Sequence, residues 1–80
     1  MANELLQHVG SQIKMFRKIK KFTIEELATI INKSKSTVSK YESGEITIDV
    51  VTLFNISKAL NINIINLLDY EEKENPIQNH

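Results

Sequence analysis

The stretch that most constrains the fold runs from Thr23 to Gly44 and predicts two short helices joined by a tight turn. Thr23 and Glu26 have the spacing of a capping box, which marks the start of a helix. Asn32 tolerates the left-handed conformation in which helices end, and Ser34 can cap the helix that follows. Gly44 then supplies the end of this second helix. Start and stop signals are therefore present for both members of the pair.

Apolar periodicity predicts one helix before this pair and two after it. The first has three- and four-residue spacing at Leu5, Leu6, Val9, Ile13, Phe16 and Ile19. The fourth is capped by Asp49 and has core-spaced residues at Val50, Leu53, Ile56 and Leu60. The fifth is short, can be capped by Asn63, and contains Ile64, Ile65, Leu67 and Leu68. We expect an all-α, compact five-helix domain over 1–69, with the helical pair at about 23–43 and an acidic, flexible tail over 70–80.

The charges are strongly segregated although the net charge is zero. Residues 14–40 contain eight basic and two acidic side chains, whereas residues 41–80 contain two basic and seven acidic ones. A distribution of this kind produces a local positive field on a neutral protein. The sequence therefore favours an anionic partner for the first half of the domain.

The predicted helix after Ser34 has a polar face made of small and cationic side chains. At about 100° per residue, Val38 and Tyr41 fall on the opposite, inward side. The outer face carries Lys35, Ser36, Ser39, Lys40 and Ser43. Short or cationic side chains let a helix enter the major groove of DNA, which is about 12 Å wide. The hydroxyls of Thr23 and Ser34 lie beside unpaired backbone N–H groups that can bind phosphate. The pattern therefore predicts contact with double-stranded DNA.

Residues for other chemistry are scarce. His8 and His80 lie at opposite ends of the chain, and no serine occupies a Gly-x-Ser-x-Gly turn. The chain has no cysteine, and we expect no catalytic residue, no metal site and no cofactor. No signal peptide and no membrane-spanning run are visible, so we expect a cytoplasmic protein.

One combined pattern runs through most of the chain. Its parts are Ile13, Phe16-Arg17, Thr23–Glu26–Leu27–Ala28, Ser34-x-x-Thr37-Val38-Ser39-x-Tyr41-Glu42-x-Gly44, Asp49, Thr52-Leu53, Ile56-x-Lys58-Ala59-Leu60 and Leu67-Leu68. From about residue 9 to residue 68 the chain resembles the lambda-repressor-like helix-turn-helix domains, the Cro/C1 or Xre group of transcriptional regulators. The resemblance implies a five-helix domain that places its third helix in the major groove.

The resemblance also implies roles for individual residues. It implies base contacts from Lys35, Ser36, Ser39 and Lys40, and contacts to the DNA backbone from Thr23, Thr37 and Ser43. Arg17 is the only arginine of the chain, and we expect it to form a partly buried ion pair with Glu42, as the family often does at these positions. Two departures predict fewer phosphate contacts: Ile24 stands where the family often has a glutamine, and Glu45 and Ile46 follow Gly44 where basic residues are common.

We expect a repressor-type regulator, encoded by a bacterium or a phage, that reads a palindromic operator as a homodimer. Helix 5 is too short to bury all of its apolar residues, which predicts a dimer interface at Ile65 and Leu68 with Tyr70 at its rim. Two alternatives stay open at this point. The chain could be an antitoxin or a restriction-modification controller that regulates its own promoter, or a protein-interaction module without DNA binding.

Overall fold

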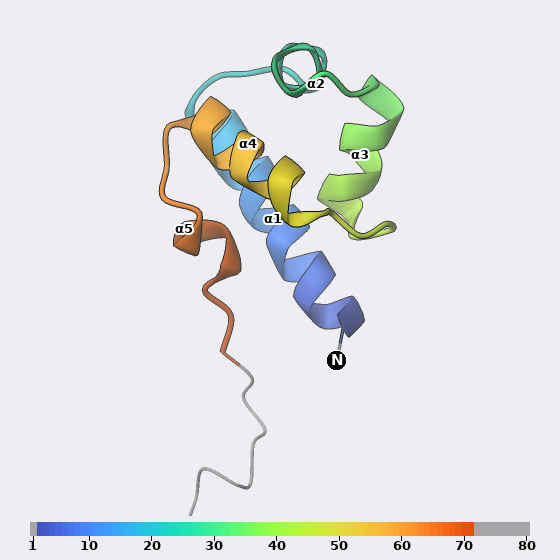
Figure 1. The fold of residues 1–80 in the computed structure, drawn as a ribbon, viewed down its shortest axis with the longest axis vertical. Helices are drawn as coiled ribbons and strands as arrows, with labels where there is room; N and C mark the ends of the chain where they lie inside the picture. The colour runs from blue at the N-terminus through green and yellow to red at the C-terminus, as the bar shows by residue number, and fades with distance from the viewer. Residues whose placement is uncertain (1, 72–80) are drawn as a thin grey trace, which may run out of the picture.

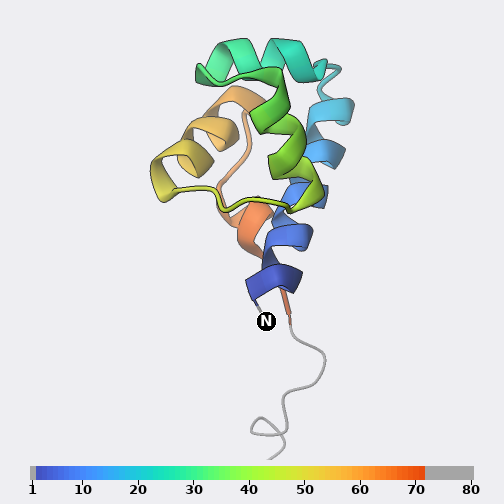
Figure 2. The ribbon, with the colours of Figure 1, turned by 90° about the vertical axis from the view of Figure 1, so that its right-hand side faces the viewer.

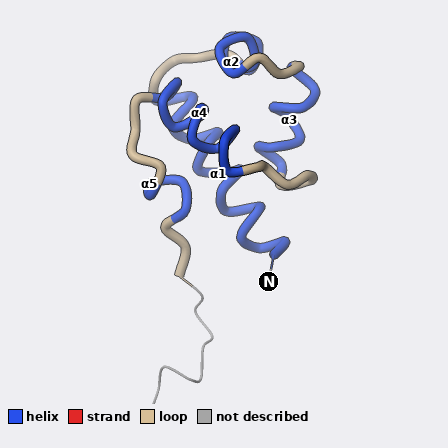
Figure 3. Tube along the Cα trace, in the orientation of Figure 1, coloured by secondary structure: helices blue, strands red, loops and turns tan. Residues whose placement is uncertain are grey.

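Five helices and no strands are present over residues 2–71, the part of the chain that the computed structural model describes (Figures 1 and 3). They are α1 (Ala2–Ile19), α2 (Ile24–Ile31), α3 (Lys35–Ser43), α4 (Val50–Leu60) and α5 (Ile65–Leu68). The predicted all-α, five-helix fold class is confirmed. Most of the predicted tail, from residue 72 onward, lies outside the described residues.

The capping signals of the helical pair act as the sequence predicts. The Thr23 hydroxyl accepts a hydrogen bond from the backbone N–H of Glu26 at 3.0 Å, and the Glu26 carboxylate accepts one from the N–H of Thr23 at 2.8 Å. Asn32 and Gly44 end α2 and α3 in the left-handed conformation, with φ of 60° and 76°. The Ser34 hydroxyl accepts from the N–H of Thr37 at 3.0 Å. Both helices are therefore fixed by contacts within a few residues of their ends.

The two later helices differ in how well they are capped. Asp49 accepts hydrogen bonds from the hydroxyl and the backbone N–H of Thr52, at 2.6 and 3.0 Å, and these bonds hold the pKa of Asp49 below its usual value. Helix α5 begins at Ile65, and Ile64 occupies its N-cap position without a side-chain cap. Asn63 still accepts from the N–H of Ile65 at 3.1 Å, because its side chain reaches past Ile64.

Helix α1 is the spine of the domain (Figures 1 and 2). It packs against α3, α4 and α5, while α2 packs against α3 and α4. Figure 2 shows α2 lying across the upper end of α1, with α3 running down from it in front of the viewer. This arrangement leaves α3 at one edge of the molecule, where one side of the helix faces outward.

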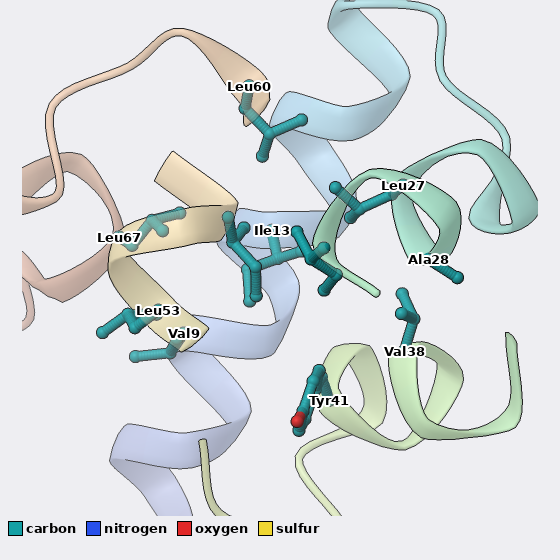
Figure 4. Packing of buried hydrophobic residues seen from close by; sticks show 11 residues of the cluster. Val9, Ile13, Leu27, Ala28, Val38, Tyr41, Leu53, Leu60 and Leu67 are labelled. Atoms are coloured by element: carbon teal, nitrogen blue, oxygen red, sulfur yellow. The ribbon is translucent and has the colours of Figure 1, made fainter. Parts of the chain in front are cut away.

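The core draws side chains from all five helices (Figure 4). Its buried members are Val9, Ile13, Leu27, Ala28, Ile31, Val38, Tyr41, Leu53, Ile56, Leu60 and Leu67. Three residues that the apolar spacing assigned to inner faces are instead exposed: Val50 is 71%, Ile19 is 61% and Leu5 is 39% accessible. At 100° per residue each lies about 90° or more around its helix from the centre of the buried stripe. The inner position near the end of α1 is occupied by Arg17.

Helices α1 and α3 approach so closely that Gly10 has no room for a side chain. A Cβ atom on Gly10 would lie 2.6 Å from the carbonyl oxygen of Glu42 and would also overlap that of Tyr41. Real Cβ contacts are essentially never this short. The glycine therefore sets the distance at which α3 packs on α1.

Candidate nucleic-acid interface

Two buried residues of α3 fix the rotation of the helix, so that its polar side faces outward. Val38 and Tyr41 are packed into the core, against α1 and α2. The opposite side is exposed and carries Lys35, Ser36, Ser39, Lys40 and Ser43. In Figures 1 and 2 no other described helix covers this side. The surface consists of hydroxyl donors and acceptors with an ammonium group toward either end.

The hydroxyls at the starts of α2 and α3 are engaged by their own helices. Thr23 accepts from Glu26, as described above, and Ser34 both accepts from the N–H of Thr37 and donates to the hydroxyl of Thr37 at 2.9 Å. Thr37 is half-buried. These three predicted contact residues therefore order the first turns, and the remaining N–H groups of those turns point outward with the positive end of the helix dipole.

An ion pair crosses from α2 to the start of α3. The Lys35 ammonium lies 3.1 Å from a carboxylate oxygen of Glu25, and both side chains remain more than 60% exposed. The hydrogen bond and the charge of Lys35 hold the pKa of Glu25 below its usual value. A carboxylate is thus present on the same surface as the first predicted base-contacting residue.

A second carboxylate lies at the opposite end of α3. The Ser43 hydroxyl donates to Glu45 at 2.6 Å, and its oxygen is also 3.2 Å from the carbonyl of Lys40. Ser43 was predicted to contact the DNA backbone, but in this structure its hydroxyl is used within the protein. Acidic side chains therefore border the polar face at both ends.

Arg17 and Glu42 are brought together between α1 and α3. Arg17 donates from Nε to one carboxylate oxygen of Glu42 at 2.6 Å and from Nη2 to the other at 3.2 Å. Its Nη1 donates to the carbonyl of Phe22 at 2.7 Å. The two side chains are only 8% and 6% exposed. This buried pair ties the end of α3 to α1 and to the turn before α2, so it fixes the direction in which α3 presents its outer face.

The three residues predicted at a dimer interface lie in different environments. Ile65 and Leu68 are exposed on α5, at 61% and 41%, while the intervening Leu67 is buried. Tyr70 is half-buried: its ring lies 5.1 Å from that of His8, and its hydroxyl donates to Glu4 at 3.2 Å. Tyr70 is therefore held against α1 of its own chain, beside the exposed part of α5.

The described residues offer little else of chemical note. Within residues 2–71 no three His, Cys, Asp or Glu side chains come together in a way that could hold a metal ion. Over the same residues no helix is long and apolar enough to cross a membrane.

The order and spacing of these helices match a known family. The helix-turn-helix family HTH_3 matches residues 13–67, which is more than half of the chain and contains both α2 and α3. The chain belongs to this helix-turn-helix family. Its five helices are accordingly the DNA-binding, Cro/C1-type fold of transcription regulators, and the families matched are regulators rather than enzymes.

Three similar proteins illustrate the range of this helix-turn-helix family. The structure of the restriction-modification controller C.AhdI from Aeromonas hydrophila is 26% identical, with 78% of this chain and 94% of that chain covered and a TM-score of 0.74. The clp gene regulator ClgR from Corynebacterium glutamicum is 26% identical, with 81% and 83% covered and a TM-score of 0.79. Antitoxin PezA from Streptococcus pneumoniae is 25% identical over 72 residues, which are 90% of this chain. The chain spans about half of PezA, 46% of its length.

Within this helix-turn-helix domain, Glu25 is the residue that the sequence did not mark as part of the candidate interface. Its place in the first turn of α2 is explained by the helix dipole alone, which favours anions there. The sequence did contain a possible partner for Glu25: Lys35, ten residues later, is the first residue of α3. Only the tight turn between the helices brings the two charges together.

Proposed function

We propose that this chain is a sequence-specific transcriptional regulator of the repressor type that binds DNA through α3. The observation that carries the proposal is the uncovered polar face of α3, held outward by the buried Val38 and Tyr41. Membership of a family of DNA-binding regulators supports it. In the proposed complex α3 lies in the major groove and reads base edges.

The chemistry of the face suits base reading. Lys35 and Lys40 can donate to the O6 and N7 atoms of guanine or to phosphate oxygens, while Ser36 and Ser39 can donate or accept. Phosphates would be bound at the first turns of α2 and α3, where Thr23 and Ser34 cap the helices, and near Thr37 and Ser43. The proposed roles divide the surface into a central reading strip and flanking contacts that position it.

A homodimer is part of the same proposal. Ile65 and Leu68 expose apolar surface on α5, and a two-fold axis would cover that surface with the same patch of a second copy. Tyr70 would lie at the rim. Two copies of α3 spaced by about 34 Å would then match the two halves of a palindromic operator. We place this function in the cytoplasm of a bacterium or in a phage-infected cell.

The relatives favour one narrower version of this function. PezA is an antitoxin and C.AhdI is a restriction-modification controller. The similarity covers 90% of this chain for PezA and 78% of this chain for C.AhdI. The alternative proposal is therefore an antitoxin or controller that regulates its own promoter. A second alternative is a protein-interaction module that does not bind DNA. An electrophoretic mobility shift distinguishes it from a DNA-binding regulator.

The test is an electrophoretic mobility shift with the DNA upstream of the protein's own gene and with a scrambled duplex. Lys35→Ala is expected to weaken binding to the specific site by about 1–3 kcal/mol and to relax base preference at one position. Lys58→Ala is the matched control, because Lys58 lies on α4 beside the ring of Phe54. If Lys35→Ala and Lys40→Ala both bind like the wild type, α3 does not read the groove. If the wild type binds neither duplex, the chain is an interaction module.

A further inference from the structure

The ion pair between Glu25 and Lys35 places an acidic side chain on a surface where DNA binding would favour basic side chains. Glu25 is the second residue of α2 and Lys35 the first of α3, so the pair joins the first turns of the two helices. The nitrogen and oxygen are 3.1 Å apart, and both side chains are exposed to solvent and to any ligand of this surface. The stability of the domain gains little from such an exposed pair.

The pair changes what the Lys35 ammonium can bind. An ammonium group has three N–H donors, and one of them is directed to Glu25. The other two can still reach the O6 and N7 atoms of a guanine, which are neutral acceptors. A phosphate that approached the same ammonium would also approach the Glu25 carboxylate, and two anions at this distance repel each other. The pair therefore permits a base contact and opposes a phosphate contact.

We propose that Glu25 is a specificity-determining residue, which restrains Lys35 to base contacts and lowers the affinity of the domain for DNA of unrelated sequence. This inference rests on the proposed DNA-binding function. Nonspecific binding arises almost entirely from lysine and arginine contacts with phosphates. An ammonium that is already neutralised by Glu25 adds little to this nonspecific binding. The ratio of specific to nonspecific affinity therefore rises, while the absolute affinity falls.

The consequence for salt dependence follows from the same charges. Each phosphate contact that releases a counterion adds about 0.9 to the slope of log affinity against log salt. In Glu25→Gln, Lys35 is free to contact a phosphate, so the slope on scrambled DNA should steepen by about 0.9 per protomer. The affinity for scrambled DNA should rise about five-fold at low salt, and the affinity for the specific sequence should rise less.

The experiment uses two duplexes of equal length and composition. One carries the sequence that the wild-type chain selects from a random pool, and the other is a scrambled version. Binding of both is measured by fluorescence anisotropy over a salt series for the wild type, Glu25→Gln, Lys35→Ala and the double variant. Glu71→Gln is the matched control, because it removes the same charge from an exposed residue after α5. Thermal melting of each variant checks that the domain remains folded.

The expected result is a gain of nonspecific affinity in Glu25→Gln that is absent when Lys35 is already alanine. Glu71→Gln should bind both duplexes like the wild type. The inference is overturned if Glu25→Gln matches the wild type, or if its gain persists in the Lys35→Ala background or equals that of Glu71→Gln. A wild-type chain that does not distinguish the two duplexes would instead overturn the proposed function itself.

Discussion

At the scale of single residues, the buried pair of Arg17 and Glu42 gives the sharpest stability prediction. Removal of one member leaves the other charge uncompensated in a site that is more than 90% closed to solvent. We expect Glu42→Ala to lower the free energy of unfolding by about 3–5 kcal/mol, measured by urea denaturation. Arg17→Lys should also destabilise, because an ammonium cannot donate to both carboxylate oxygens and to the carbonyl of Phe22 in the same way.

The control for this pair is Glu45→Ala, which removes an exposed carboxylate three residues further along. A surface change of this kind typically alters stability by no more than about 0.5 kcal/mol. Equal stability of Glu42→Ala and Glu45→Ala would mean that the pair between α1 and α3 contributes nothing beyond an ordinary surface charge.

What the sequence predicts at this scale depends on how local the contact is. The caps at Thr23, Ser34 and Asp49 could be predicted because each hydrogen bond joins residues three apart, so spacing alone defines it. The contact between Glu25 and Lys35 could not be predicted in this way. It depends on the direction in which α3 leaves the turn after α2, which the core determines.

At the scale of the helices, the contact between α1 and α3 depends on Gly10. Alanine is the better helix former, and at an exposed position Gly→Ala would stabilise a helix by up to about 1 kcal/mol. At Gly10 the added methyl group would overlap two carbonyl oxygens of α3. We expect Gly10→Ala to destabilise the domain by about 1–3 kcal/mol in thermal or urea unfolding, because α3 must shift.

Ser11→Ala provides the comparison for this prediction. Ser11 is the next residue of α1 and is exposed, so an added preference for helix can act there without a clash. A raised melting temperature for Gly10→Ala would show that α3 can move away from α1 at no cost.

The helices themselves were predictable, whereas the rotation of each helix about its axis was predictable only in part. The inner faces of α2 and α3 are those that the periodicity indicates, because both helices are short and bounded by clear caps. Val50, Ile19 and Leu5 were wrong as core residues, since each lies about 90° or more around its helix from the centre of the buried stripe. Apolar spacing identifies a stripe, but only packing determines where the stripe ends.

At the scale of the whole molecule, the segregated charge and the apolar surface of α5 suggest that two copies act together. A single domain with acidic residues at both ends of the polar face of α3 would bind DNA weakly. Two linked domains multiply their separate affinities through a high effective concentration. A dimer would therefore combine modest contacts per copy with high affinity for a site that has two matching halves.

The proposed dimer can be tested at the exposed side chains of α5. Ile65 and Leu68 expose apolar side chains, and a charge placed between two copies would be costly because it could not be hydrated. We expect the wild-type chain to sediment as a dimer at micromolar concentration, and Ile65→Glu or Leu68→Glu to shift it to a monomer that binds the palindrome much more weakly. Val51→Glu is the comparison, because Val51 is about as exposed as Ile65, at 63% against 61%, but lies on α4. If Val51→Glu alone dissociates the dimer, the interface lies on α4. If the wild-type chain is a monomer and none of these changes affects it, the chain binds DNA without the proposed two-fold partner.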